Sequence, residues 1–549
     1  MGGGSLKRRK VDLDFYLRRV FQKKSFRPLQ QEAIAAAIEG HDVFLQANTS
    51  FGKSLCFQLP AVISHGVTVV ICPLLALMTD QVKALQALGI AVATINSTTP
   101  IAERRSILDD LLSGHPKTRL LYVTPELCQT ETFRRNLQTI HRQGELNRIA
   151  IDEAHCISEW GHDFRPAYKE LGWFKRTLIN PSVPISALTA TATPRVREDI
   201  IKLLGLDAAQ LKIFNTPSAR PNIHYEIRYL DDFASDPTEP EGFQINDLVS
   251  WLQSVQARRE AGIGDESATL PPISGIIYVP LRTVCDKLAT SLSAAWDDRI
   301  HAVAYHAGLS SEDRTRIQAE WTSSKSAPQT TNNDSSNQSP KAPAFYVIVA
   351  TTAFGMGIDS PHVRFVIHWS PPRSFEGFVQ ESGRAGRDGC AAASIVYYNT
   401  QERDRILDRL QRDIENARNR AGGQISNQGN QYSKTQSTVQ NQLSRLASFE
   451  KVISYCENTT RCRHDLIKDF FGDLELERMG SQAPASGVNT SGGQLTSPCD
   501  FACDFCKEGR QSLAKRKARM APESRMEDFV DMNVPWYMQR MFPGLFPGG

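Results

Sequence analysis

The sequence predicts an α/β protein with two lobes, each built on a mostly parallel sheet, followed by a small helical module that carries a group of cysteines. Two series of short apolar runs alternate with helical stretches, a pattern typical of parallel sheets. The chain of 549 residues also exceeds the usual size of one hydrophobic core. Cysteines cluster after the second series, where they predict a separate module.

The predicted strands fall into two groups. First-lobe strands are expected at 43–46, 67–72, 120–123, 148–152 and 185–189. Second-lobe strands are expected at 275–279, 301–305, 346–350, 365–368 and 394–397. An acidic stretch rich in Pro and Gly connects the groups at about 230–272, with one helix predicted at 248–259. Polar inserts at 322–343, 421–441 and 479–497 contain too few apolar residues to order themselves.

The segment after the first predicted strand has the spacing of a phosphate-binding loop. Ala47 is followed by four residues and then by Gly52, Lys53 and Ser54. The glycine lets the backbone close around phosphate oxygens, the lysine reaches the β and γ phosphates, and the serine hydroxyl suits Mg²⁺. The next helix points its positive end at the anion. A chance Gly-Lys-Ser sequence at a helix start is the alternative, which the matching acidic strand downstream disfavours.

This loop departs from the usual pattern at Ser50 and Phe51, where small residues or glycines are common. Only glycine adopts positive φ freely, and an aromatic ring needs room. We therefore expect nucleotide binding to survive and turnover to be slower than in a glycine-rich loop.

Two adjacent carboxylates follow a buried strand at 149–151. Asp152 is suited to hold Mg²⁺, and Glu153 to activate or orient a water. Trp160, Phe164 and Arg165 then share a short polar loop. Aromatic rings mixed with a guanidinium are suited to stack on unpaired bases, although packing in a core is the alternative for the rings.

A pair of arginines lies far downstream, at Arg384 and Arg387, separated by small residues. Both can reach one anion if they share a helical face, and an arginine offered across a cleft stabilises a transferring phosphoryl group. A surface salt-bridge cluster is the alternative. The intervening glycines disfavour it, because a plain exposed helix avoids glycine.

Taken together, these stretches resemble the RecQ family of superfamily 2 helicases over roughly residues 12–510. The matching segments occur in the family's order: 26–30 (FRPLQ), 47–60 (ANTSFGKSLCFQLP), 72–81 (CPLLALMTDQ), 122–126 (YVTPE), 152–155 (DEAH), 188–194 (LTATATP), 219–222 (ARPN), 304–308 (AYHAG), 350–359 (ATTAFGMGID) and 380–389 (QESGRAGRDG). The resemblance implies two RecA-like lobes, ATP and Mg²⁺ as cofactors, and 3′ to 5′ movement on DNA.

The resemblance also implies roles for single residues. Residues expected to bind the nucleotide are Arg27 and Gln30 at adenine, Thr49, Gly52, Lys53 and Ser54 at the phosphates, and Asp359. Residues expected to act in hydrolysis are Asp152 at Mg²⁺, Glu153 as base, Arg387 as arginine finger and Arg384 beside the γ-phosphate. His155 and residues 189–191 would couple the two sites, and the loop at 158–166 would sense single-stranded DNA through Trp160, Phe164 and Arg165.

The cysteine group predicts a zinc site. Cys462 is followed, after an insert, by Cys499, Cys503 and Cys506, and four thiolates suit tetrahedral Zn²⁺. The RecQ family has a zinc module here, but its last three ligands are often spaced with two residues in each gap. The first gap here has three, and Cys456 is the reserve ligand. The other cysteines are expected to be reduced thiols of an intracellular protein.

Composition agrees with this interpretation without requiring it. Net charge is only +3, so the overall charge does not demand nucleic acid, and no apolar run is long enough to cross a bilayer. A basic run at 7–10 is either a nuclear-import signal or a solvated charged arm. The expected domains are a flexible basic N-terminus (1–11), an ATP-binding lobe (12–222), a connector (223–272), a second lobe with its insert (273–400), a helical hairpin with the zinc module (401–510) and a basic, aromatic tail (511–549).

The expected function is an ATP-dependent helicase that binds single-stranded and tailed duplex DNA in the nucleus, with repair or recombination proteins as possible partners and no membrane. The tail after the zinc module is too short for a winged-helix domain, so a minimal core or a truncated product is expected. A DNA-binding scaffold with little ATPase activity is the main alternative, because of Ser50, Phe51 and the missing winged helix. An RNA-unwinding ATPase is a third, which the aromatic loop and zinc module disfavour.

Overall fold

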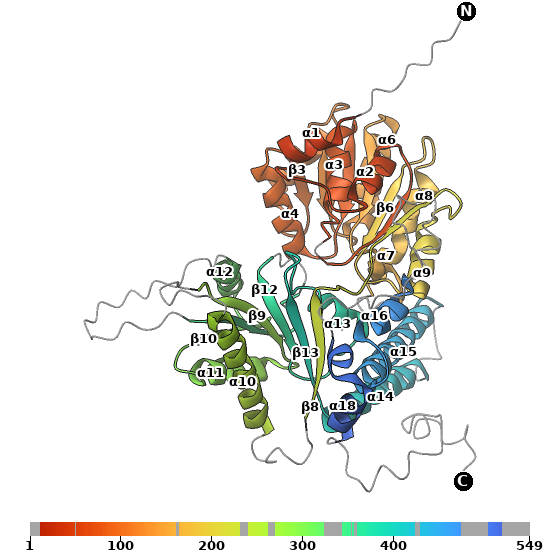
Figure 1. Ribbon diagram of the computed structural model, residues 1–549. Helices are drawn as coiled ribbons and strands as arrows, with labels where there is room; N and C mark the ends of the chain where they lie inside the picture. Colours follow the sequence, from red (N-terminus) through yellow and green to blue (C-terminus); the bar gives the residue numbers. More distant parts are fainter. Residues whose placement is uncertain are drawn as a thin grey trace, which may run out of the picture.

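The computed structural model describes residues 11–49, 51–160, 164–230, 240–261, 270–322, 343–352, 354–355, 360–422, 429–473 and 503–518. Figure 1 shows two sheets, one above the other, with a group of helices beside the lower sheet. This arrangement confirms the predicted fold class of two parallel α/β lobes with a C-terminal helical module.

The first lobe is a seven-stranded sheet in the order β3-β4-β2-β5-β6-β1-β7, and every pairing is parallel. Its strands are β1 (Val43–Gln46), β2 (Val67–Ile71), β3 (Val92–Ile95), β4 (Leu120–Val123), β5 (Leu146–Ile151), β6 (Ile185–Thr189) and β7 (Lys212–Asn215). Its longer helices are α1 (Leu13–Arg19), α2 (Gln30–Ile38), α3 (Leu55–Ile63), α4 (Leu75–Ala87), α5 (Ile101–Leu111), α6 (Glu131–Arg142) and α9 (Pro194–Leu204), with short helices α7 (Pro166–Lys169) and α8 (Trp173–Thr177). Apolar clusters cover both faces of the sheet, which is why its central strands are continuous apolar runs.

The second lobe is a six-stranded parallel sheet in the order β10-β11-β9-β12-β13-β8. Its strands are β8 (Ile223–Tyr229), β9 (Ile273–Tyr278), β10 (Ile300–Tyr305), β11 (Phe345–Ala350), β12 (Val363–His368) and β13 (Ala392–Tyr398). Its helices are α10 (Pro240–Ala261), α11 (Arg282–Ala294), α12 (Ser311–Thr322) and α13 (Phe375–Ser382). Helix α10 contains the helix predicted at 248–259.

Strand β8 differs from the expectation for residues 223–272. These residues were expected to be a connector, but their first seven form an edge strand that pairs in parallel with β13. Alternate residues of β8, starting at Ile223, are buried against the sheet. Apolar and polar residues alternate in β8, but this pattern is recognised as a strand of the second sheet only when its partner strand β13 is known.

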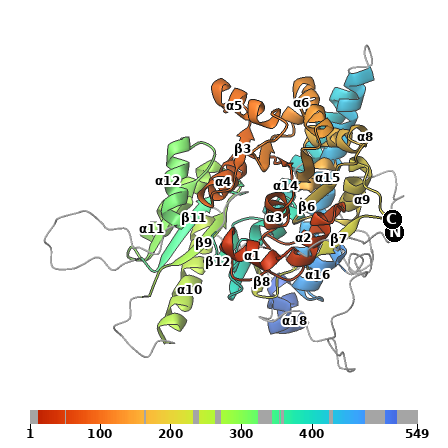
Figure 2. The ribbon, with the colours of Figure 1, turned by 90° about the horizontal axis from the view of Figure 1, so that it is seen from above.

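The helical module consists of α14 (Thr400–Gly422), α15 (Gly429–Glu457), α16 (Arg463–Phe471) and α18 (Asp504–Ala518). Residues 429–441, expected to belong to a disordered insert, form the first turns of α15, which packs along α14. Gln and Ser are tolerated in helices when a neighbouring helix supports them. Viewed from above, this module lies against the second lobe on the side of β8 (Figure 2).

The helical module and the second lobe share one apolar core. That cluster joins residues of β8, α13 and β13 to residues of α14, α15 and α16. Basic residues near the end of α18 also hold it to the sheet, since Arg516 donates to the carbonyl of Ile227 over 2.6 Å. The basic stretch at 515–517, expected in a tail, is therefore part of a packed helix.

Candidate functional site

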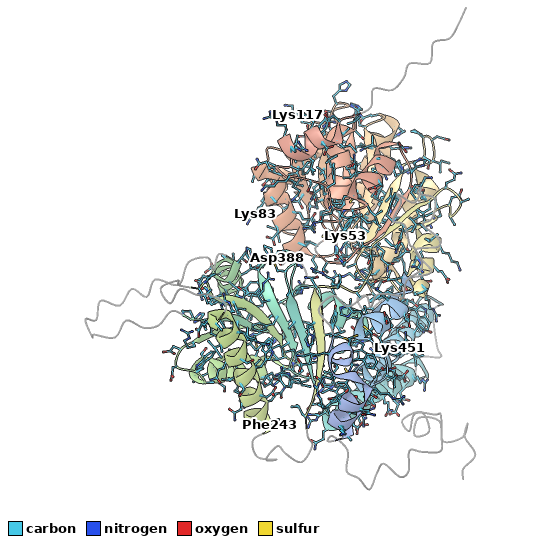
Figure 3. All side chains as sticks on the ribbon, in the orientation of Figure 1. Lys53, Lys83, Lys117, Phe243, Asp388 and Lys451 are labelled. Atoms are coloured by element: carbon cyan, nitrogen blue, oxygen red, sulfur yellow. The ribbon has the colours of Figure 1, made fainter. Side chains whose placement is uncertain are left out.

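The phosphate loop lies at the carboxyl end of β1, at the edge of the first lobe that faces the second. Figure 3 places Lys53 on this edge and Asp388 on the facing edge of the second lobe. The Lys53 ammonium donates to the carbonyls of Ala47 (3.0 Å) and Asn48 (3.3 Å). Gly52 has φ +80°, the left-handed conformation that glycine adopts without strain.

Lys53 lies in a field of mixed charge. Burial lowers the pKa of its ammonium, Arg387 of the second lobe lowers it further, and Glu153 and Asp152 raise it. The structure therefore brings the lysine, both carboxylates and one arginine within electrostatic range of one another. These four groups were predicted from three separate segments of the sequence.

Gln30 connects the start of α2 to the phosphate loop. Its side-chain amide donates to the carbonyls of Phe51 (2.7 Å) and Gly52 (3.3 Å), and its oxygen accepts from the backbone amide of Arg27 (2.9 Å). A Cβ at Gly52 would lie 2.9 Å from the same amide nitrogen. Gln30 thus links the segment expected to read adenine with the loop expected to hold the phosphates.

The Phe51 ring has a place in the core of the first lobe. It is 6% exposed and belongs to the apolar cluster that includes Leu17 and Phe21 at the N-terminal helix. The ring therefore points away from the inside of the phosphate loop. Ser50 lies outside the described residues, and slower turnover remains a prediction.

The acidic pair directly follows β5, as expected. Asp152 is 4% exposed and Glu153 is 8% exposed, and Glu153 adopts the left-handed conformation with φ 49° and ψ 49°. Burial, reinforced by the Glu153 charge, raises the pKa of Asp152 to about 6, and Lys53 opposes the rise. Asp152 also accepts a weak hydrogen bond from the amide of Gln81 over 3.4 Å. Two adjacent carboxylates, together with the Ser54 hydroxyl of the phosphate loop, are a donor set that suits Mg²⁺.

His155 links the acidic pair to the end of the next strand. Its Nδ1 lies 3.3 Å from a carboxylate oxygen of Glu153 and 3.0 Å from the hydroxyl of Thr189 on β6. Burial would lower the pKa of His155, but Cys156 and Glu153 raise it, and the net direction is upward. The backbone amide of Thr191 donates to the same Thr189 hydroxyl over 3.2 Å. The residues expected to couple the two sites are therefore in contact.

The two predicted arginines both lie on the turn after α13, which ends at Ser382, so they do not share a helical face. Arg387 lowers the pKa of Lys53, and both arginines oppose the rise that burial causes in the pKa of Tyr278. Arg384 is 4% exposed and also lies beside Gly355, and a shared contact of both arginines with one anion stays a prediction. Asp359, the remaining predicted nucleotide residue, lies outside the described residues.

The aromatic loop is held by contacts that the sequence did not predict. The Arg195 guanidinium lies 3.2 Å from the ring centroid of Trp160, a cation–π contact. Lys169 lies 5.3 Å from the ring centroid of Phe164, and Arg165 donates to the carbonyl of Pro73 over 2.6 Å. Residues 161–163 of the loop lie outside the described part of the chain.

Trp160 also lines a cleft of about 650 Å³ between the first lobe, the second lobe and the helical module. Besides the predicted Arg384, four further arginines line this cleft: Arg373, Arg405, Arg409 and Arg445. We call these four residues the arginine cleft. Sequence reasoning missed them, although Arg405 and Arg409 are four residues apart on α14 and therefore share a face.

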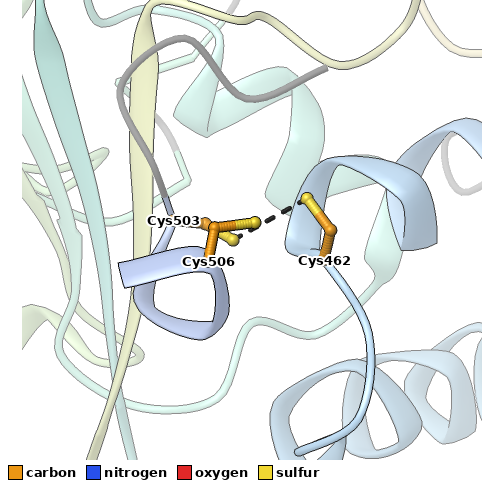
Figure 4. A group of neighbouring side chains, drawn as sticks. All are labelled: Cys462, Cys503 and Cys506. Carbon is orange, nitrogen blue, oxygen red and sulfur yellow. Dashed lines mark hydrogen bonds between the residues drawn. The ribbon is translucent and has the colours of Figure 1, made fainter. Parts of the chain in front are cut away.

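The cysteine group is confirmed for three of its four predicted members. The ligand atoms of Cys462, Cys503 and Cys506 lie within 4.8 Å of one another (Figure 4). The Cys462 and Cys503 sulfurs are 3.8 Å apart, close to the roughly 3.8 Å between thiolates on one tetrahedral zinc ion with 2.3 Å bonds. Cys499 lies outside the described residues. Cys456, the reserve ligand, is buried in the shared core outside this group.

Three family models match the chain. Residues 27–200 match the DEAD/DEAH box helicase model, residues 269–389 the helicase conserved C-terminal domain, and residues 411–507 the RecQ zinc-binding model. The first two matches fall on the two lobes and the third on the helical module. Among the described residues, no helix is long and apolar enough to cross a membrane.

Similar proteins include ATP-dependent DNA helicase Q5 of Rattus norvegicus, which is 37% identical over 462 residues, 83% of this chain and 42% of that protein. ATP-dependent DNA helicase Q1 of Rattus norvegicus is 35% identical over 459 residues, 83% of this chain and 62% of that protein. ATP-dependent DNA helicase hus2/rqh1 of Schizosaccharomyces pombe is 38% identical over 464 residues, 83% of this chain and 29% of that protein. The chain thus spans less than two thirds of the length of each of these relatives.

Solved structures support the fold. The DUF1998 helicase MrfA bound to DNA has a TM-score of 0.53 at 16% identity, covering 71% of this chain and 51% of that one. The Mycobacterium smegmatis helicase Lhr bound to ssDNA and AMP-PNP has a TM-score of 0.50 at 18% identity, covering 81% of this chain and 57% of that one.

Proposed function

We propose that this chain, which belongs to the RecQ family of DNA helicases, hydrolyses ATP to move along single-stranded DNA and unwind duplex DNA. The observation that carries the proposal is that charged groups of the two lobes face one another at the phosphate loop. There Lys53 and the acidic pair of the first lobe lie within electrostatic range of Arg387 of the second. A site divided between two lobes can be assembled and opened by their movement, which is what a translocating motor requires.

The chain's own groups suit phosphoryl transfer to water. Glu153 is placed to accept a proton from the attacking water, whose oxygen bonds to the γ-phosphorus while the bond to the leaving oxygen of ADP breaks. Lys53 and Arg387 stabilise the negative charge on the transferring phosphoryl group. Asp152 and Ser54 would hold Mg²⁺, which neutralises phosphate charge when bound. His155 orients Glu153 through their 3.3 Å contact.

The adenine end of the nucleotide is assigned to Arg27 and Gln30, as the family resemblance implies. The contacts of Gln30 with the phosphate loop support a further role, because an adenine that displaces the Gln30 amide would also disturb its bonds to Phe51 and Gly52. Arg384 is assigned a place beside the γ-phosphate, on the side of the site that the second lobe provides. Thr49, Gly52 and Asp359 complete the proposed nucleotide site.

The proposed DNA path crosses the cleft that Trp160 lines. Trp160 and Phe164 offer rings for stacking on unpaired bases, and Arg165 and the arginine cleft offer positive charge to the phosphates. We propose 3′ to 5′ movement, a role in DNA repair or recombination, and action in the nucleus, as the family resemblance implies. Phosphate contacts should make DNA binding weaken steeply with salt.

Zinc is assigned to Cys462, Cys499, Cys503 and Cys506. Three of these thiols already lie at distances that suit one ion, and the ion would tie α16 to the start of α18. The buried Phe51 ring supports a working motor over the scaffold alternative, because the aromatic side chain occupies the core of the lobe and not the phosphate loop.

The proposal is tested by measuring ATP hydrolysis with and without single-stranded DNA in the wild-type protein, in Lys53→Ala and in Lys117→Ala. Lys117 is exposed at the far end of the first lobe (Figure 3), so it is a matched control. We expect DNA to stimulate hydrolysis in the wild type and in Lys117→Ala, and Lys53→Ala to abolish it. DNA binding with no hydrolysis above the Lys53→Ala level would overturn the motor and leave a scaffold.

A further inference from the structure

Arg220 is a buried arginine in the segment that joins the two lobes, and the proposed mechanism does not use it. It is 7% exposed. Its guanidinium donates to the carbonyls of Gly383 (3.1 Å) and Ala385 (3.2 Å), and also to that of Gly386. These carbonyls belong to residues 383–387, which we call the arginine loop because it carries Arg384 and Arg387. One planar fork of donors therefore binds three carbonyls of a single turn.

Asn222, two residues after Arg220, also binds the same turn. Its side-chain amide donates to the carbonyls of Gly386 (2.9 Å) and Cys390 (2.7 Å), and its oxygen accepts from Arg220 (3.3 Å). Gly386 has φ +58°, and a Cβ there would lie 2.5 Å from the Asn222 amide nitrogen. The turn is thus packed so closely against Asn222 that only glycine fits.

The arginine loop touches the phosphate loop on its other side. A Cβ at Gly383 would lie 2.4 Å from the hydroxyl of Thr49, so the backbone of the second lobe meets the phosphate loop directly. Because the loop's carbonyls are bound by Arg220, rotation of its peptide units is restricted. The direction in which Arg387 leaves the turn is therefore fixed by residues of the joining segment.

Helix α16 of the helical module supports Arg220 from behind. The carbonyl of Arg220 accepts a hydrogen bond from Nε2 of His464 over 3.1 Å; because a carbonyl only accepts, this nitrogen carries the proton. Asp473, just after α16, accepts from the backbone amide (2.8 Å) and the hydroxyl (2.7 Å) of Ser218. Nδ1 of His464 lies 3.9 Å from the sulfur of Cys462, which places the cysteine group at the far end of this chain of contacts.

We propose that Arg220 is a positioning residue that sets the geometry of Arg387, and that helix α16 of the helical module acts on the ATP site through it. This inference rests on the proposed function. A displacement of about 1 Å at a reacting group lowers a rate about 100-fold, so loss of the guanidinium acts mainly on kcat. The nucleotide is bound chiefly by the first lobe, and its KM should change little.

The test compares Arg220→Gln with Arg148→Gln in steady-state ATPase assays at saturating single-stranded DNA. Arg148 is also buried, and it donates to the carbonyls of His41 (3.0 Å) and Ala37 (2.5 Å) in the first lobe. It therefore controls for loss of a buried, carbonyl-bound arginine outside the site. We expect Arg220→Gln to lower kcat about 10- to 100-fold with less than about a threefold change in KM for ATP, and Arg148→Gln to keep kcat.

A double-mutant cycle separates positioning from general damage. If Arg220 acts through Arg387, then adding Arg220→Gln to Arg387→Ala should lower kcat less than about threefold further. Hydrogen exchange at residues 383–390 should be faster in Arg220→Gln than in the wild type and unchanged in Arg148→Gln. The inference would be overturned if the losses of kcat from the two substitutions multiplied independently in the double mutant. A normal kcat in Arg220→Gln, or unchanged hydrogen exchange at 383–390 in that variant, would also overturn it.

Asn222→Ser provides a second variant if Arg220→Gln does not fold. It removes two donations to the turn and should produce the same kcat loss with smaller size; an unchanged kcat would overturn the inference. Failure of the proposed function is distinct, since it appears as no ATP hydrolysis by the wild type. The exchange measurement requires no hydrolysis, so it still decides whether Arg220 orders the arginine loop.

Discussion

The ion pair between Arg463 and Asp504 makes a sharp prediction about how the helical module is held. Both side chains are 0% exposed and lie 2.8 Å apart. Asp504 also accepts from the amide of Ile227 in β8 over 3.0 Å, so this carboxylate joins α16, α18 and the second sheet. Asp504→Asn removes the charge while keeping the shape, and leaves the Arg463 guanidinium buried without its counter-charge.

The expected cost is about 3–5 kcal/mol, the usual effect of removing one partner of a buried ion pair. The matched control is Asp469→Asn in the same module. Asp469 pairs with Arg461 at 2.5 Å, but both side chains are 49% exposed, and such surface pairs contribute about 0–1 kcal/mol. Both substitutions change an arginine-paired Asp to Asn, so they compare a buried pair that also binds the Ile227 amide with an exposed pair.

The assay is urea unfolding of the full chain, combined with the rate at which a coloured chelator removes zinc. If zinc leaves through a rapid local opening of the module, the expected cost corresponds to a rate increase of about 100-fold or more for Asp504→Asn. Asp469→Asn should increase the rate less than about fivefold. Equal stability and equal zinc loss in the two variants would refute the argument that this buried pair anchors the module.

Three further predictions concern the first lobe. Because burial raises the pKa of Asp152 to about 6, the folded protein keeps this proton where the unfolded chain has lost it, and its stability falls as pH rises from about 4 to 6. Asp152→Asn should therefore stabilise the nucleotide-free protein at pH 7 by roughly 1–3 kcal/mol while abolishing ATPase activity. Equal melting temperatures of the variant and the wild type at pH 7 would contradict this. Phe51→Gly should lower first-lobe stability by about 3–5 kcal/mol in denaturant unfolding, and a more stable variant would show that the ring is strained. Arg195→Ala removes the cation–π partner of Trp160 and should change the DNA concentration needed for half-maximal ATPase stimulation more than twofold; an unaltered value would show that this contact does not set the ring's position.

The sequence was sufficient to predict features that depend on local pattern. The strands appear as apolar runs because parallel sheets are buried on both faces. The loop at Gly52 and Lys53 and the carboxylates at Asp152 and Glu153 follow their strands directly, so strand position predicts side-chain position. The spacing of the cysteines predicted one group, and three of them lie together.

Features that depend on distant partners could not be predicted. Phe51 departs from the usual loop pattern, and nothing in the local sequence shows that its ring is buried in an apolar cluster with residues distant along the chain. The strand β8 is recognisable only beside β13, and Arg384 and Arg387 lie on a turn and not on a helix because α13 ends at Ser382. Arg220 belongs to the segment 219–222 of the family resemblance, but the carbonyls it binds lie more than 160 residues away.

The hydrogen bonds on either side of Pro217 locate a pivot. The amide of Thr216 donates to the carbonyl of Gln46 over 2.9 Å, so it belongs to the first lobe, whereas Ser218 is bound to Asp473 beyond α16. Proline fixes φ near −65°, so a swing of one lobe that preserves both anchors has few backbone torsions to use. Since the helical module shares its core with the second lobe, the two would move together relative to the first lobe. The protein would then move as two rigid bodies connected by a segment of restricted backbone freedom at Pro217.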